Sequence, residues 1–276
     1  MIKFTKMHGL GNDFVVIDAI AQDISLTTEQ IKFIADRNFG VGCDQLLLVE
    51  KPVSDNADFK YRIFNADGSE VAQCGNGARC FARFVRDKKL SEKNSLIVDT
   101  DSGQLILNFD ADGLITVNMG VPRHFPVDIP LNTEQESLLY TVVNNNLETP
   151  FGAVSMGNPH AVIAVNDITT APVAELGAAL ESHSFFPERA NIGFMQIINR
   201  QHIKLRVYER GAAETLACGS GACAAVVIGI EQNLLDQKNI CVELPGGQLE
   251  ISWAGREHAV FMKGPATSVF EGQIEL

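Results

Sequence analysis

The sequence has no cluster of lysine or arginine, and its formal net charge is -12 at pH 7. A chain of this charge without a basic patch is a poor match for nucleic acid or for an anionic membrane surface, so neither is expected as a partner. The longest apolar run, residues 222–230, is far shorter than the roughly 20 residues that cross a bilayer. Because the amino terminus also lacks a secretory signal pattern, we expect a cytoplasmic protein that acts on small molecules.

The six cysteines show no C-x2-C spacing of the kind that binds zinc. In a chain expected in the cytoplasm they predict free thiols rather than a disulfide framework. Four of them, Cys43, Cys80, Cys223 and Cys241, have apolar neighbours and are expected to behave as small core residues. The lysines lie in charged or strand-like contexts rather than beside Gly/Ser-rich loops, so no pyridoxal site, and no cofactor, is predicted.

One motif occurs twice, around Cys74 and around Cys218. In both copies a glutamate precedes the cysteine by four residues, and the cysteine begins the pattern Cys-Gly-polar-Gly-Ala. Each copy follows a strand-like run and precedes a helical run, so each cysteine should stand where a helix begins. A helix start favours anions, which predicts a thiol pKa lowered from about 8.5 towards neutrality.

The same helix starts offer backbone N–H groups to a ligand. The first N–H groups of a helix have no acceptor within it, and they bind carboxylates and phosphates. The residues concerned are Gly75, Asn76, Gly219 and Ser220.

Other features recur in the same order in the two halves of the chain. Gly11-Asn12 recurs as Gly157-Asn158. Gln45 has a predicted counterpart in Gln196, which follows an expected turn at residues 191–193. The similar spacings predict an internal duplication and an α+β fold. We expect two pseudo-symmetric lobes, each a curved mixed or antiparallel sheet around a central helix, with the active site in the cleft between them. The predicted boundaries are 1–119, joined by the strand 264–276, and 120–263.

Two thiols on opposite walls of a cleft suit the inversion of a carbon centre by two bases, in which one thiolate removes a proton and the other thiol delivers one. The charge that develops on the substrate carboxylate must then be stabilised. A helix dipole contributes about 0.3 to 2 kcal/mol, whereas one preorganised oxyanion donor contributes roughly 3 to 4 kcal/mol. Several N–H donors are therefore required.

Further polar residues have both structural and functional interpretations. His160 begins an apolar strand, where a histidine can be a purely structural group, but it also follows the repeated Gly-Asn turn. Asparagines are common in turns. Four of them near the repeated features could instead bind an ammonium and a carboxylate, and Arg210 could bind a carboxylate through two hydrogen bonds. These four are Asn12, Asn65, Asn158 and Asn191.

Taken together, these motifs resemble the diaminopimelate epimerase family over essentially the whole chain. They are the segments 7–14, 65–69, 74–79, 157–160, 209–211 and 218–222. The resemblance implies a cofactor-independent epimerase that converts LL-2,6-diaminopimelate to the meso form, in lysine and peptidoglycan precursor biosynthesis. It also implies two lobes that close on the substrate and a homodimer.

Residue by residue, the resemblance makes Cys74 and Cys218 the acid/base pair, assisted by His160 and Glu209. It places Phe270 at a dimer contact, where a tyrosine is common, and Ala213 where glycine is common. The positions that match substrate-binding residues are Asn12, Gln45, Asn65, Gly75, Asn76, Asn158, Asn191, Glu209, Arg210, Gly219 and Ser220.

Three alternatives remain open at this stage. A proline or hydroxyproline racemase also uses two cysteines without a cofactor, although Arg210 and the asparagines favour a substrate with a second amino-carboxylate arm. A thiol redox protein would cycle a disulfide between Cys74 and Cys218. A hydrolase built on Cys74 and His160 leaves the second cysteine motif unexplained.

Overall fold

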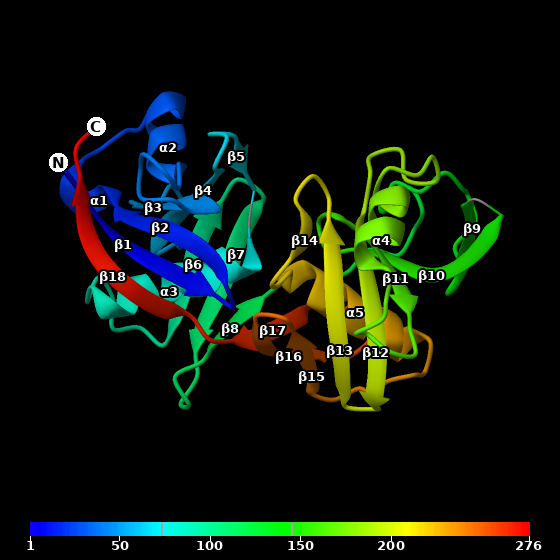
Figure 1. Cartoon of the computed structure of the whole chain (residues 1–276). Helices are drawn as coiled ribbons and strands as arrows, with labels where there is room; N and C mark the ends of the chain where they lie inside the picture. The colour runs from blue at the N-terminus through cyan, green and yellow to red at the C-terminus, as the bar shows by residue number, and fades with distance from the viewer. Residues whose placement is uncertain (73, 145) are drawn as a thin grey trace. The chain divides into compact units, whose positions relative to one another are not determined.

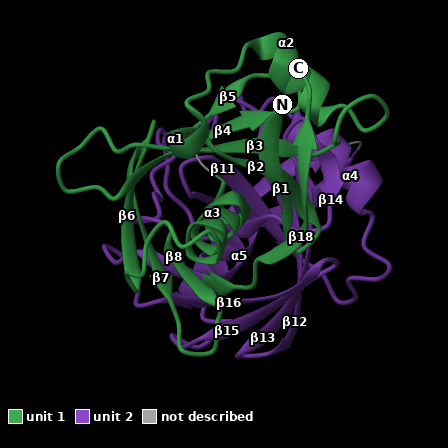
Figure 2. Cartoon of the chain, turned by 90° about the vertical axis from the view of Figure 1, so that its left-hand side faces the viewer, with its two compact units in different colours: residues 1–118, 263–276 green, residues 119–262 purple. Residues whose placement is uncertain are grey.

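The chain divides into two compact units in the computed structural model, which describes residues 1–72, 74–144 and 146–276 (Figures 1 and 2). Unit 1 consists of residues 1–118 and 263–276, and unit 2 of residues 119–262. Both termini belong to unit 1, because the first strand, β1, pairs antiparallel with the last, β18.

In unit 1, strands pair in the order β18–β1–β2–β3–β4, and β4 then pairs with both β5 and β6, which leads to β7 and β8. The pairs β2–β3 and β4–β6 are parallel. The strands are β1 (Ile2–Gly9), β2 (Asn12–Asp18), β3 (Gln45–Glu50), β4 (Phe59–Asn65), β5 (Glu70–Val71), β6 (Ser95–Thr100), β7 (Gly103–Phe109), β8 (Ile115–Asn118) and β18 (Thr267–Ile274). The helices are α1 (Ala19–Gln22), α2 (Thr28–Ala35) and α3 (Gly75–Asp87).

Unit 2 repeats this order as β9–β10–β11–β12–β13, with β13 pairing with both β14 and β15, and β15 with β16. The parallel pairs are again the equivalent ones, β11–β12 and β13–β15. The strands are β9 (Tyr140–Asn144), β10 (Leu147–Ser155), β11 (Pro159–Ala164), β12 (Asn191–Asn199), β13 (His202–Glu209), β14 (Ala213–Thr215), β15 (Ile240–Leu244), β16 (Gly247–Trp253) and β17 (Val260–Gly264), whose last two residues belong to unit 1. The helices are α4 (Val173–Glu181) and α5 (Gly219–Glu231).

The strand register shows the duplication residue by residue. Leu96 lies opposite Leu107, and 144 positions later Ile240 lies opposite Ile251. One expected correspondence is wrong: Gln45 pairs with Phe14, and the equivalent pair is Asn191 with His160, so Asn191 and not Gln196 is the counterpart of Gln45. Residues 191–193 form the start of β12 rather than a turn.

Each unit wraps its strands around one central helix, as Figure 1 shows for α3 and α5. Helix α3 contacts β1, β2, β3, β4, β7, β8 and β18, and α5 contacts β10, β11, β12, β13 and β16. From Gly219 to Ile230, every residue of α5 except Ser220 is buried. A helix that is apolar on nearly all sides requires such a surround, because any uncovered face would expose hydrocarbon to water. The predicted α+β fold with a duplicated sheet-and-helix unit is confirmed.

Candidate active site

Both cysteines of the repeated motif immediately precede a helix, as the sequence predicted. Cys74 and Cys218 are the extended N-cap residues of α3 and α5. The carbonyl of Cys74 accepts the first helical hydrogen bond from Ala78, at 2.8 Å, and that of Cys218 accepts from Ala222, at 3.0 Å. Helix geometry therefore directs the N–H groups of the first turns, residues 75–77 and 219–221, towards the helix ends.

The glutamates that precede the cysteines form ion pairs with arginines. Glu70 binds Arg62 of β4, and Glu214 binds Arg206 of β13. The hydrogen bond from Arg62 lowers the pKa of Glu70. The matched glutamates of the motif thus anchor the loop before each cysteine to the preceding strand.

Unit 1 holds several of the predicted site residues, some of them beside Cys74. The thiol of Cys74 lies 3.7 Å from Oδ1 of Asn12, and the same oxygen accepts from Nδ2 of Asn76 at 3.4 Å. Gln45 donates to Oδ1 of Asn65 at 2.9 Å. Because β2, β3 and β4 are neighbours in the sheet, the three side chains at positions 12, 45 and 65 come from adjacent strands.

Unit 2 holds several of the predicted site residues close to Cys218. The sulfur of Cys218 lies 3.7 Å from Oγ of Ser220. Nε2 of His160 lies 3.0 Å from that hydroxyl and 3.0 Å from Oδ1 of Asn158. A chain of polar contacts therefore connects the thiol to the imidazole through a hydroxyl that can either donate or accept.

The expected lowering of the thiol pKa is wrong for Cys218. Burial raises its pKa well above the ordinary value, and the negative charge of Glu209 and a hydrogen bond to that carboxylate raise it further. The residue is only 4% exposed, so the loss of hydration outweighs the favourable helix start. Cys218 is therefore a protonated thiol at neutral pH, with the Glu209 carboxylate beside it as a hydrogen-bonding partner.

His160 is neutral over the physiological range. Burial lowers its pKa to about 3, and the nearby charge of Arg210 acts in the same direction. A neutral imidazole donates through one nitrogen and accepts through the other, so His160 acts here as a hydrogen-bonding partner rather than as a cation.

Asn191 supports the loop that carries Arg210. Its Oδ1 accepts from the backbone N–H of Arg210 at 3.0 Å, and its Nδ2 donates to the carbonyl of Pro159 at 3.0 Å. The guanidinium of Arg210 donates to the carbonyl of Glu188 at 3.0 Å. Further along the loop Ala213 has a φ of 60°, so the position where the family favours glycine does require the left-handed region.

The sequence did not single out two buried residues beside Cys74. The hydroxyl of Tyr61 donates to the Cys74 carbonyl at 3.2 Å, and Gly77 faces that hydroxyl so closely that a Cβ would lie 2.5 Å from it. The other residue is Arg79, fully buried on the first turns of α3. The sequence offered one signal for Arg79, which is its place in the Cys-Gly-Asn-Gly-Ala-Arg motif. A buried arginine needs hydrogen-bonding partners, so it can orient the polar groups around it.

The remaining cysteines carry free thiols, as do Cys74 and Cys218. Cys43, Cys80 and Cys223 are buried, as expected for core residues, and Cys241 is partly buried. Burial raises the pKa of Cys43 to about 11 and that of Cys80 to about 12. In the described segments 1–72, 74–144 and 146–276, no His, Cys, Asp and Glu side chains gather in a group suited to a metal ion. In the same segments, no helix is long and apolar enough to span a membrane.

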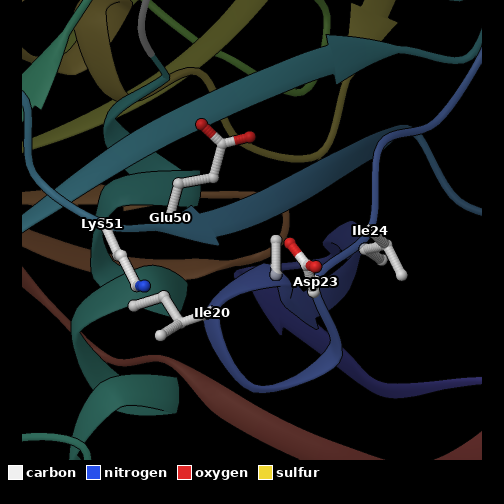
Figure 3. A pocket seen from close by; sticks show the side chains of 6 residues that line it. Ile20, Asp23, Ile24, Glu50 and Lys51 are labelled. Carbon is white, nitrogen blue, oxygen red and sulfur yellow. The ribbon is translucent and has the colours of Figure 1, made fainter.

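A pocket of about 480 Å³ lies in unit 1, at α1 and the end of β3 (Figure 3). Its lining contains none of the predicted site residues and consists of Ala19, Ile20, Asp23, Ile24, Glu50 and Lys51. The pocket is therefore separate from the cysteine-centred groups of residues.

The fold is shared with solved enzymes of isomerase type. A hydroxyproline epimerase from Agrobacterium vitis, solved with bound trans-4-hydroxy-L-proline, matches with a TM-score of 0.73 at 12% identity, over 98% of this chain and 91% of that one. At this identity the similarity concerns the fold alone.

Comparison of sequences gives much higher identities with a different set of proteins. The family model described as diaminopimelate epimerase matches residues 4–125 and 152–269. A diaminopimelate epimerase from Nitrosomonas europaea is 58% identical and one from Teredinibacter turnerae 56% identical, each over 275 residues that cover 100% of this chain and 99% of the relative. The chain belongs to the diaminopimelate epimerase family, as its motifs predicted.

Proposed function

We propose that this chain is a cofactor-independent isomerase that converts LL-2,6-diaminopimelate to the meso form, with Cys74 and Cys218 as the acid/base pair. The single observation that carries the proposal is the equivalence of the two thiols, which precede equivalent helices in a duplicated fold. The names of the 56–58% identical relatives supply the substrate.

In the proposed reaction one sulfur, as thiolate, takes the α-proton, and the other, as thiol, gives a proton to the opposite face of the same carbon. Substrate and product are isomers, so no proton is gained or lost overall. The reaction requires the two units to present their thiols to one substrate from opposite sides. Glu209 would take the proton of Cys218 and so convert this buried thiol into the base.

The negative charge formed on the substrate carboxylate needs several preorganised donors. We assign this role to the N–H groups at the starts of α3 and α5, from Gly75, Asn76, Gly219 and Ser220. His160 would hold Ser220 in place as a neutral partner. For binding the rest of the substrate, including its second amino-carboxylate arm, we propose Asn12, Gln45, Asn65, Asn158, Asn191, Glu209 and Arg210.

The same proposal includes a cytoplasmic homodimer that serves lysine and peptidoglycan precursor biosynthesis. Phe270 lies on β18, half-exposed and in edge-to-face contact with Phe4 at 6.0 Å between ring centroids. An exposed aromatic ring on an outer strand is suited to a contact with a second copy. We further propose that catalysis uses two lobes, residues 1–119 with 264–276 and residues 120–263. The reaction would need no cofactor.

The decisive experiment is incubation with LL-diaminopimelate in D2O under reducing conditions, followed by NMR. We expect meso product with deuterium at the inverted α-carbon, and its loss in Cys74→Ala and in Cys218→Ala. A folded single variant with normal turnover would rule out the two-thiol mechanism.

The same preparation should be offered L-proline and trans-4-hydroxy-L-proline. Their turnover without any turnover of diaminopimelate would favour the racemase function that the fold also supports. In the other alternative, a thiol redox protein, a Cys74–Cys218 disulfide would form and break as part of the function. We expect oxidation instead to inactivate the epimerase, because it removes both acid/base groups. Full epimerase activity after air oxidation without reductant would contradict this expectation.

A further inference from the structure

A directed chain of side-chain amides runs past the Cys74 thiol in unit 1. Arg79 donates through Nη2 to Oδ1 of Asn76 at 2.8 Å, and Asn76 donates through Nδ2 to Oδ1 of Asn12 at 3.4 Å. Asn12 in turn donates through Nδ2 to a carboxylate oxygen of Asp44 at 3.0 Å. All three hydrogen bonds have the same direction, from a guanidinium at one end to a carboxylate at the other.

The charged ends determine which way each amide faces. A guanidinium has only donors, so Asn76 must turn its oxygen towards Arg79, and an ionised carboxylate has only acceptors, so Asn12 must turn its NH2 group towards Asp44. The amide oxygen of Asn12 is thereby directed to Cys74, 3.7 Å from its sulfur. An acceptor at this place can accept a hydrogen bond from the S–H group but cannot donate one to a thiolate.

Both ends of the chain are themselves held in place. Arg79 is fully buried and also donates to the carbonyls of Gly75, at 3.3 Å, and Pro265, at 3.1 Å. Gly9 lies so close that a Cβ there would be 3.3 Å from Nη2 of Arg79. At the other end, Asp44 also accepts from Arg37 at 2.7 Å and from the backbone N–H of Asp13 at 3.1 Å.

Unit 2 has polar residues at the positions equivalent to Asn12 and Asn76. It has no charged residue at the positions equivalent to Asp44 and Arg79. The counterparts of Asn12 and Asn76 are Asn158 and Ser220, whereas those of Asp44 and Arg79 are Ala190 and Cys223. Cys218 therefore faces the hydroxyl of Ser220, which can reverse its direction, and Cys74 faces an amide that cannot.

We propose that Asp44 and Arg79 are positioning residues, which orient Asn12 and Asn76 so that a fixed acceptor holds Cys74 as the thiol in the ligand-free protein. Cys74 is then the proton donor at rest, and the pair of Cys218 and Glu209 is the base. This assignment rests on the proposed two-thiol function and deepens it. The hydrogen-bond direction can nevertheless be tested without turnover.

The test is the pH dependence of iodoacetamide alkylation at Cys74, followed by peptide mass spectrometry so that the other five cysteines do not interfere. Asp44 is half-exposed, so Asp44→Ala should fold normally. Without the carboxylate the Asn12 amide can turn its NH2 group to the sulfur and stabilise the thiolate. We expect the alkylation midpoint to move to lower pH by about 0.5 to 1 unit, which is about a three- to tenfold faster reaction below the midpoint.

The removal of a negative charge would also lower the midpoint without any rotation of Asn12. The same substitution in an Asn12→Ala background separates the two causes, because a pure charge effect persists there and an orientation effect disappears. We expect less than a third of the shift to remain. An equal shift in both backgrounds, or no shift with Asn12 present, would overturn the proposal.

Two further variants serve as controls. Arg37→Gln removes a charge from the same cluster while leaving Asp44 beside Asn12, and it should move the midpoint slightly in the opposite direction. Arg79→Lys keeps a donor for Asn76 and should stay close to the wild type. The Asp44→Ala shift should be larger in a folded Arg79→Met background, because Asn76 then no longer holds the oxygen of Asn12. An equal Asp44→Ala shift with and without Arg79 would remove Arg79 from the proposal. If these shifts occur in a protein that does not epimerise diaminopimelate, only the proposed function fails.

Discussion

Arg206 binds Glu214 through two hydrogen bonds, from Nε to Oε1 at 2.6 Å and from Nη2 to Oε2 at 2.8 Å. The equivalent pair in unit 1, Arg62 and Glu70, has the same two distances. A bidentate pair fixes orientation as well as distance. Each pair therefore ties the segment that leads to a cysteine to the strand before it.

Glu214→Gln should weaken this connection while preserving the shape of the side chain. The pair is partly exposed to water, so we expect a loss of about 0.5 to 1 kcal/mol in the free energy of unfolding and a several-fold lower kcat/KM. Urea unfolding and steady-state kinetics would measure the two effects. Glu243→Gln, which removes a carboxylate of β15 that pairs with Lys204 of β13, should leave kcat/KM unchanged. Equal losses in both variants would contradict a specific role for Glu214.

The cysteine loops were predictable because their signals are local. Glycines and small residues after a strand-like run mark the start of a helix, and both helices begin at the residue after the cysteine. The thiol pKa was not predictable in this way. The burial of Cys218 and its contact with Glu209, nine residues earlier, arise only when β13, β14 and α5 pack together.

The sequence-based alignment of the two halves of the chain was wrong at one position, where it matched residues of the same type. Gln196 resembles Gln45 in type, but strand pairing makes Asn191 its counterpart. Register depends on contacts between distant segments, and one sequence does not reveal them. The orientation of Asn12 has the same origin, because Asp44, which sets it, lies 32 positions away along the chain.

Ala213 predicts a stabilising substitution. Its φ of 60° is unfavourable for an alanine and free of steric cost for a glycine. Glycine also increases the entropy of the unfolded chain, which offsets part of this benefit. We therefore expect Ala213→Gly to raise the free energy of unfolding by a net of about 0.5 to 1 kcal/mol. Ala212→Gly, next to it but with negative φ, should bring no gain. A destabilised Ala213→Gly variant would show that the loop does not need the left-handed conformation.

Glu209→Gln should have opposite effects on ionisation and on turnover. The carboxylate raises the pKa of Cys218 through its charge and its hydrogen bond, so its removal should lower that pKa and move alkylation of Cys218 to lower pH. Turnover should nevertheless fall by about 10²-fold or more, because the group that accepts the thiol proton is lost. Glu214→Gln provides the matched control and should not move the alkylation midpoint. Unchanged alkylation in Glu209→Gln would show that the carboxylate does not act on Cys218.

His160 predicts a specific loss of stability in acid. Its pKa falls from the ordinary 6.5 to about 3 on folding, so below pH 6.5 the unfolded chain binds a proton that the folded chain does not. The free energy of unfolding should therefore decrease by about 1.4 kcal/mol for each pH unit between 6.5 and 3 through this residue alone. His160→Gln should remove this contribution, and urea unfolding at pH 7, 5.5 and 4.5 would measure it as a shallower decline than in the wild type. His258→Gln, at an exposed position, should decline as the wild type does. If His160→Gln also declined as steeply as the wild type, the imidazole would have to be protonated in the folded protein, and Ser220 would face a cation instead of a neutral partner.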